Sequence, residues 1–328
     1  MTALETLLFA YVLNAAWQLP LLAGFGWLLR RILRPSPRLE YALWLLIASL
    51  AFLLPLSTGL GLWEPALLSE ASSVTIPDSA QWSRLVLVVW LLPSLWHTVR
   101  LLRNLLATHR LRAQGATLFA HHGVAVRESP QVLGTAGPLL VGLFRPVVFI
   151  PRFLFDPARR DLLDAALAHE LAHVRRHDMA TSLLSHLLLL PLRCHPVSAW
   201  IVNELDSSRE LACDAHCALH PLDYARCLLD IARHCVEPRG PLTALGIADA
   251  QILERRIHAL TFPVHRRPKA YEFGALAIAL LLACALLTGA ARSTYRRIAH
   301  LPAPRLIRDT LTMPPAPPPP PPALRVRR

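Results

Sequence analysis

Near the middle of the chain lies the stretch Ala168-His169-Glu170-Leu171-Ala172-His173, which carries two histidines four positions apart. The run around it, Arg159–Asp178, reads as an amphipathic helix. On a helix, residues i and i+4 share a face, so His169 and His173 can present two imidazole nitrogens to one tetrahedral zinc ion. Glu170 lies beside them, where its carboxylate can take a proton from metal-bound water. The stretch therefore predicts a Zn2+ site on a helix, with a base next to it.

The composition is that of a membrane protein. Of the 328 residues, 54% are hydrophobic, and the mean hydropathy is +0.39. An ordinary soluble domain is less apolar than this. The net charge is +12, carried almost wholly by arginine, with Lys269 as the only lysine. Because the arginines cluster beside apolar runs, we expect a membrane lipid surface as the partner and no direct contact with nucleic acid.

Apolar runs divide the chain. The candidate transmembrane helices are Thr6–Leu29, Tyr41–Trp63, Leu85–Val99 and Phe273–Ala291. The third is long enough for a hydrocarbon core of about 30 Å only if the arginines at its ends snorkel to the surface. We therefore expect a mainly α-helical protein with about four transmembrane helices. Its expected domains are a membrane domain at 1–103, a metal-binding domain at 104–270, a fourth span at 271–291 and a Pro/Arg-rich tail at 292–328.

The distribution of arginine orients these spans. Four arginines follow the first run, namely Arg30, Arg31, Arg34 and Arg38, whereas the next loop is acidic. By the positive-inside rule, the first loop and the segment 104–270 are cytoplasmic, and both termini lie outside. The proline-rich part of the tail, 313–323, is expected to be extended polyproline II. It is either a disordered extension or a segment that binds a periplasmic partner.

Two parts of the inner segment have a predicted structure. Residues Gly123–Glu128 and Pro138–Pro151 are rich in Val, Leu, Ile and Phe between Gly and Pro, which indicates short strands in a small sheet. A substrate strand could pair with an edge near Val147–Ile150. Met179–Leu192 is apolar but too short to count as a span, and it fits a buried helix or an interfacial one.

A third metal ligand is expected on a second helix, Ser198–Leu219. There Glu210 and Asp214 are spaced i, i+4, so Glu210 can bind the metal while Asp214 accepts a hydrogen bond from the outer N–H of a ligand histidine. Glu204 and Asp206 are rival ligands on the same helix.

Other side chains near these helices have an expected position or role. His177 would lie about 12 Å from His169 along a straight helix, too far to share one zinc, so it is expected in the outer shell or on the surface. Tyr224 and the histidines after Cys213 are candidates to stabilise the oxyanion formed during peptide hydrolysis, by residue type alone.

These motifs together resemble the BlaR/MecR-type membrane metalloproteases, which transduce signals for antibiotic-resistance operons. The matching segments are Gly142–Pro151, His169–Asp178, His195–Pro196, Arg209–Asp214 and Leu253–Ile257. The resemblance implies four spans and an α+β zincin-like (gluzincin) domain in a bacterial inner membrane. It implies His169, His173 and Glu210 as zinc ligands and Glu170 as the catalytic base. It also implies a cytoplasmic winged-helix repressor, or the protease's own linker, as the substrate.

The chain departs from that family at its end. The tail after 291 is too short for the large penicillin-binding sensor domain of the β-lactam sensors, and no Ser-x-x-Lys motif is present for acylation. Two other functions stay open. One is a non-catalytic membrane receptor or scaffold with a structural zinc site. The other is a CAAX-type or quality-control membrane protease, since the Glu-x-x-x-Asp arrangement also resembles that group.

Overall fold

A computed structural model describes most of the first 262 residues. The described ranges are 3–60, 80–114, 117–129, 137–216, 220–236 and 247–262, with isolated positions at 274, 277, 281 and 285. The predicted fourth span at 271–291 lies outside the described residues apart from those isolated positions. The tail at 292–328 lies outside them altogether.

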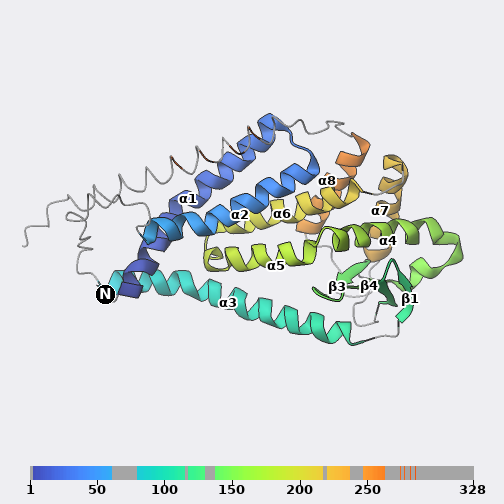
Figure 1. The fold of residues 1–328 in the computed structure, drawn as a ribbon, viewed down its shortest axis with the longest axis horizontal. Helices are drawn as coiled ribbons and strands as arrows, with labels where there is room; N and C mark the ends of the chain where they lie inside the picture. The colour runs from blue at the N-terminus through green and yellow to red at the C-terminus, as the bar shows by residue number, and fades with distance from the viewer. Residues whose placement is uncertain are drawn as a thin grey trace, which may run out of the picture.

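Three long helices form the membrane part of the described chain. They are α1 (Ala3–Leu33), α2 (Pro37–Gly59) and α3 (Ala80–Arg112). All three are long and apolar enough to cross a bilayer, as the first three apolar runs predict. The third is much longer than predicted, because it continues past Val99 through a basic segment to Arg112. In Figure 1, α1 and α2 run side by side, and α3 starts beside the N-terminal end of α1 and then diverges from both.

A helical hairpin lies along these spans. It consists of α5 (Asp178–Leu189), a short 3-10 helix η5 (Leu190–Leu192) and α6 (Pro196–Asp214). Its apolar residues Leu189 and Ile201 share one buried core with Trp44 of α2. The indole N–H of Trp90 on α3 donates to the carbonyl oxygen of Pro191 at 2.6 Å. One face of the short apolar helix α5 therefore packs against the membrane helices.

A small sheet lies at one end of the molecule, as predicted. Its strands are β1 (Thr117–His121), β2 (Val124–Glu128), β3 (Leu139–Val141) and β4 (Val147–Ile150), in the order β1-β2-β4-β3. Strand β4 pairs with β2 in parallel and with β3 antiparallel. The prediction that a substrate strand pairs near Val147–Ile150 is therefore wrong, because both sides of β4 are occupied. In the described sheet, the edges belong to β1 and β3.

Helix α4 (Arg160–Arg175) packs on this sheet. Two 3-10 helices precede it, η3 (Arg152–Phe155) and η4 (Pro157–Arg159). Its Leu167 and Leu171 are buried with Val148 and Ile150 of β4. The helix ends earlier than the predicted Asp178, because His177 adopts the left-handed conformation at φ 57° and α5 starts there in a new direction.

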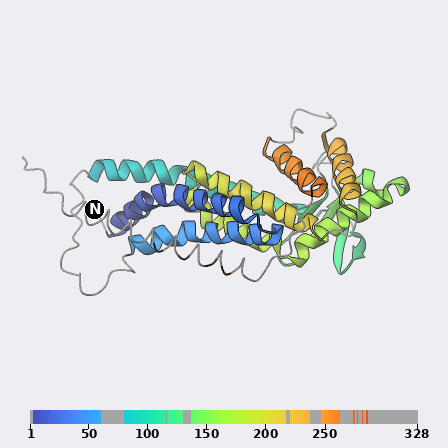
Figure 2. The same ribbon diagram turned by 90° about the horizontal axis from the view of Figure 1, so that it is seen from above.

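Two more helices complete the described fold, α7 (Pro221–Val236) and α8 (Ile247–Thr261). Figure 2 shows α4, α7, α8 and the sheet gathered at one end of the molecule, beside the ends of the membrane helices. This end carries the histidines of α4 and the carboxylates of α6.

Candidate metal centre

Three potential ligand atoms converge between α4 and α6. His169 Nε2 lies 3.1 Å from Glu210 Oε2 and 3.2 Å from His173 Nε2, and His173 Nε2 lies 3.7 Å from Glu210 Oε1. Two ligands bound at about 2.1 Å to one tetrahedral ion are about 3.4 Å apart. The spacing of the three side chains therefore fits a single zinc-sized ion between them.

The hydrogen bonds of the histidines also fit a cation. His169 Nδ1 lies 3.2 Å from Asp214 Oδ1, and His173 Nδ1 lies 2.8 Å from Asp178 Oδ2. An ionised carboxylate only accepts hydrogen bonds, so these contacts favour the tautomer in which each ring carries its proton on Nδ1 and turns an Nε2 lone pair inward. In that tautomer the two lone pairs and the carboxylate of Glu210 would all be acceptors facing one another. A positive ion at this point would satisfy all three.

Local structure explains why these side chains meet. His169 and His173 are one turn apart on α4, and Glu210 and Asp214 are one turn apart on α6, which crosses it. The predicted helix at Ser198–Leu219 is shorter in the structure and ends at Asp214.

The rival acids on α6 are engaged elsewhere. Glu204 binds Arg30 at 2.7 Å, and Asp206 binds Arg209 at 3.0 Å. The structure thus brings Glu210, rather than either rival, to the two histidines.

The Nδ1 side of His169, which faces away from the ligand group, contacts residues that lie far along the chain. The guanidinium of Arg256 on α8 donates to both oxygens of Asp214, at 2.7 and 2.8 Å. The hydroxyl of Tyr224 on α7 donates to Asp214 at 2.9 Å and lies 3.0 Å from His169 Nδ1. Burial opposes ionisation of Asp214, but the charge and hydrogen bonds of Arg256 act together with the contact to His169 and hold the pKa of that carboxyl below its usual value.

Tyr224 and Arg256 therefore have roles that the sequence does not reveal. The Tyr224 hydroxyl is on the Nδ1 side of His169, away from the face where the ligand atoms meet, so it orients the ring instead of stabilising an oxyanion. Arg256 also reaches Glu210 Oε2 at 3.4 Å. Only the match of Leu253–Ile257 to the resembled family pointed to this helix.

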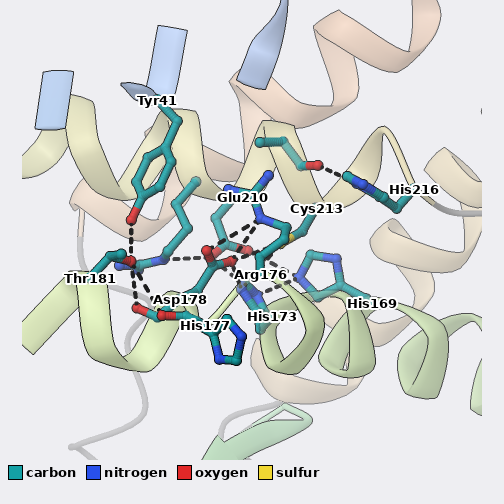
Figure 3. A network of polar contacts seen from close by, with 12 residues as sticks. Tyr41, His169, His173, Arg176, His177, Asp178, Thr181, Glu210, Cys213 and His216 are labelled. Carbon is teal, nitrogen blue, oxygen red and sulfur yellow. Dashed lines mark hydrogen bonds and ion pairs between the residues drawn. The ribbon is translucent and has the colours of Figure 1, made fainter. Parts of the chain in front are cut away.

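The outer side of His173 is held by a neighbour in sequence. Asp178 accepts from His173 Nδ1 and also from Arg176 Nε at 3.1 Å. Figure 3 shows Arg176, Asp178 and Cys213 gathered around the ring of His173. This role of Asp178 was not predicted, because the helix was expected to run unbroken from Arg159 to Asp178. His177 is exposed and takes no part in the ligand group, in line with its expected position.

Cys213 belongs to this outer shell. Its sulfur lies 3.2 Å from His173 Nδ1, and its thiol donates to Asp178 Oδ2 at 3.1 Å. Cys213, Asp178 and His173 are thus a second group close enough to hold an ion. Burial and the Asp178 charge raise the pKa of the thiol far above its ordinary value, so it stays protonated. A protonated thiol is a hydrogen-bond donor and a poor metal ligand.

Glu170, the expected base, is buried on α4 beside the ligand group. Burial raises the pKa of its carboxyl, although the neighbouring histidines act in the opposite direction. A raised pKa makes a carboxylate a stronger base, which suits proton transfer near neutral pH. The arrangement can therefore hold a metal at His169, His173 and Glu210 and move a proton at Glu170.

A family model matches most of the chain. The family, described as BlaR1 peptidase M56, matches residues 10–260, which include most of α1, the helices α2 and α3, the sheet and the whole metal centre. No curated protein matches the chain.

Proposed function

Because the chain belongs to the M56 family of BlaR1-type peptidases, which are membrane-associated metallopeptidases, we propose that it is a membrane zinc endopeptidase that cleaves a cytoplasmic repressor. One observation carries the enzymatic part of this proposal. His169, His173 and Glu210 offer three ligand atoms to one point. Three protein ligands with one position open to water are typical of catalytic zinc, whereas structural zinc has four.

The residues divide the chemistry between them. Zinc held by the three ligands would polarise the substrate carbonyl and lower the pKa of a water molecule to about 7. The carboxylate of Glu170 takes a proton from the attacking water as its oxygen bonds to the carbonyl carbon. Glu170 then gives this proton to the amide nitrogen, and the C–N bond breaks to release an amine and a carboxylic acid, whose proton passes to the amine. Asp214 and Asp178 keep the two imidazole rings in the tautomer and orientation that bind metal.

The substrate is proposed to bind as an extended strand along β3. This strand is an edge of the described sheet, and it contacts α4, the helix of the histidines. Extended peptides commonly add to such an edge through main-chain hydrogen bonds. Phe144, in the turn that follows β3, is 91% exposed and offers an apolar contact to a substrate side chain.

The cellular setting follows from the family and the arginine pattern. The proposed place is a bacterial inner membrane, with the metal centre on the cytoplasmic side and both termini outside. A winged-helix repressor is the proposed substrate, and the protease's own linker is a second one.

Co-expression with candidate winged-helix repressors tests the proposal. Wild type should give repressor fragments that disappear when zinc is chelated. Glu170→Gln should keep the metal but lower the cleavage rate about 100–10,000-fold, the usual contribution of a general base. Glu128→Gln is a matched control, because Glu128 lies on β2 with its side chain 44% exposed and pairs only loosely with Arg152, at 3.9 Å. Cleavage by Glu170→Gln at the wild-type rate would remove the mechanism.

A further inference from the structure

The start of α2 is linked to both halves of the metal centre through intervening side chains. Glu40 and Tyr41 are consecutive residues there, where this candidate membrane span emerges near α6 and α8. Each of them begins a separate series of polar contacts, one leading to each histidine.

The first series runs from Tyr41 to His173. The Tyr41 hydroxyl lies 2.6 Å from Thr181 Oγ1, and the guanidinium of Arg176 lies over the Tyr41 ring, 5.2 Å from its centroid. Arg176 Nε binds Asp178 at 3.1 Å, and Asp178 binds His173 at 2.8 Å. Figure 3 shows this series from Tyr41 down to the histidine.

The second series begins at Glu40 with a cluster of alternating charges. Glu40 accepts from Arg30 at the end of α1, at 3.0 Å, and from Arg255 of α8. Glu204 of α6 binds the same two arginines, at 2.7 and 3.0 Å. Arg255 also donates to the hydroxyl of Ser207 at 2.7 Å. Four charges from α1, α2, α6 and α8 therefore meet at one place.

The cluster continues to His169 through the next residue of α8. Consecutive side chains on a helix point about 100° apart. Arg255 therefore faces the membrane helices while Arg256 faces Asp214 and Glu210. Because both arginines also bind α6, they fix the rotation and the height of α8 against it. A shift of α2 that moves Arg255 must move Arg256 as well.

The burial of these groups makes the contacts costly to break separately. The side chains of Glu40, Glu204 and Arg255 are 10%, 15% and 23% exposed. Removing one partner of a buried ion pair leaves the other charge uncompensated, so such groups tend to move together.

We propose that Glu40 and Tyr41 are positioning residues of the metal centre, through which the membrane helices set the orientation of both metal-binding histidines. The regulatory meaning of this link rests on the proposed function, since it would let a displacement of the spans in the membrane change the activity of the protease. The link itself concerns only the metal centre and can be tested without substrate.

The test measures metal binding by the full-length protein in nanodiscs. The readouts are the zinc dissociation constant, by competition with a chromophoric chelator, and the visible absorption spectrum of the cobalt-loaded protein, which reports ligand geometry. Loss of a direct outer-shell partner typically weakens metal binding about 10–100-fold. Acting two steps beyond that direct partner, Glu40→Gln should raise the zinc Kd about 3–10-fold and Tyr41→Phe about 2-fold. Both should shift the cobalt spectrum.

The chain offers matched controls in the same membrane domain. Glu5→Gln breaks an ion pair between α1 and α3, where Arg84 Nε lies 3.3 Å from Glu5. Tyr11→Phe removes a buried hydroxyl of α1. Both controls should keep the wild-type Kd and spectrum. Thermal melting of each variant separates a loss of folding from a loss of metal affinity.

Two comparisons decide the outcome. If the series is continuous, Glu40→Gln combined with Arg255→Gln should be no weaker in zinc binding than Arg255→Gln alone, because the second change acts on a link already broken. A Glu40→Gln protein with the Kd of Glu5→Gln, or fully additive effects in the double variant, would overturn the proposal. If Glu40→Gln does not fold, Tyr41→Phe carries the test. A Tyr41→Phe protein with the same Kd and cobalt spectrum as Tyr11→Phe would then overturn the proposal. Loss of repressor cleavage in any variant bears only on the proposed function.

Discussion

The two metal-binding histidines have the same inner role but are supported in different ways. His173 is oriented by Asp178, five residues away across the turn between α4 and α5. His169 is oriented by Asp214, which is itself held by Arg256, 87 residues beyond that histidine. The carboxylate that orients His173 therefore comes from the neighbouring turn of the chain. The half of the centre around His169 exists only after α6, α7 and α8 have packed against α4.

The difference extends to how tightly each carboxylate is bound. Arg256 binds both oxygens of Asp214 with two nitrogens, at 2.7 and 2.8 Å. Arg176 approaches Asp178 with Nε alone, at 3.1 and 3.3 Å. A bidentate guanidinium–carboxylate pair is stronger and more directional than a single shared donor. We therefore expect the distant half to be the more sensitive to substitution.

The largest effect should come from the ligand that both halves share. In Glu210→Gln the carboxylate charge is lost, and the two imidazoles keep only a weak amide oxygen opposite them. Zinc affinity should fall by more than about 100-fold, beyond the range seen for outer-shell changes. Metal analysis of the purified protein measures this. A variant that retains one zinc per chain after dialysis would show that Glu210 is not a ligand.

Asp214→Asn should have the next largest effect and tests the distant half. The amide can still accept from His169, but the buried guanidinium of Arg256 loses its bidentate partner and keeps only the longer contact to Glu210, at 3.4 Å. We expect a zinc affinity about 10–100-fold weaker and a free energy of unfolding lower by about 3–5 kcal/mol. Zinc competition and thermal melting measure the two effects. An unchanged melting temperature would mean that the ion pair between Arg256 and Asp214 does not stabilise the fold.

The ligand group and its distant carboxylate could be proposed from the sequence because helical spacing alone fixes which residues share a face. His169 and His173 on one helix, and Glu210 and Asp214 on another, need only two straight helices that cross. The match over residues 10–260 places all four within one family region.

The other supports could not be derived in this way. Asp178 reaches His173 because α4 is interrupted at His177, which has a φ of 57°, and most histidines do not adopt that conformation even though the residue type is enriched there. Arg256 meets Asp214 through the packing of α8, which no local pattern specifies. The interior position of β4 depends on strand order, and an apolar strand reads alike in the middle of a sheet and at its edge.

Asp178→Asn tests the local half and sharpens the comparison. Arg176 binds Asp178 through Nε alone and also contacts the ring of Tyr41. Its guanidinium therefore keeps a partner when the Asp178 charge is removed. We expect zinc affinity to fall about 10-fold, at the lower end of the outer-shell range, and stability to fall by about 1–2 kcal/mol. The same two measurements apply. An effect larger than that of Asp214→Asn would show that the half around His173 is the more sensitive to substitution.

Cys213→Ser should have the smallest effect, and it separates two roles for the group formed by Cys213, Asp178 and His173. If the thiol only donates to Asp178, a serine hydroxyl replaces it, and the protein should lose at most about 1 kcal/mol of stability. Wild type and variant should then bind the same number of zinc ions, one per chain. If the group were a second metal site, titration of wild type would show a further zinc equivalent that Cys213→Ser lacks. The raised pKa of the thiol favours the first role, because a site at neutral pH would have to remove a proton that burial and the Asp178 charge hold in place.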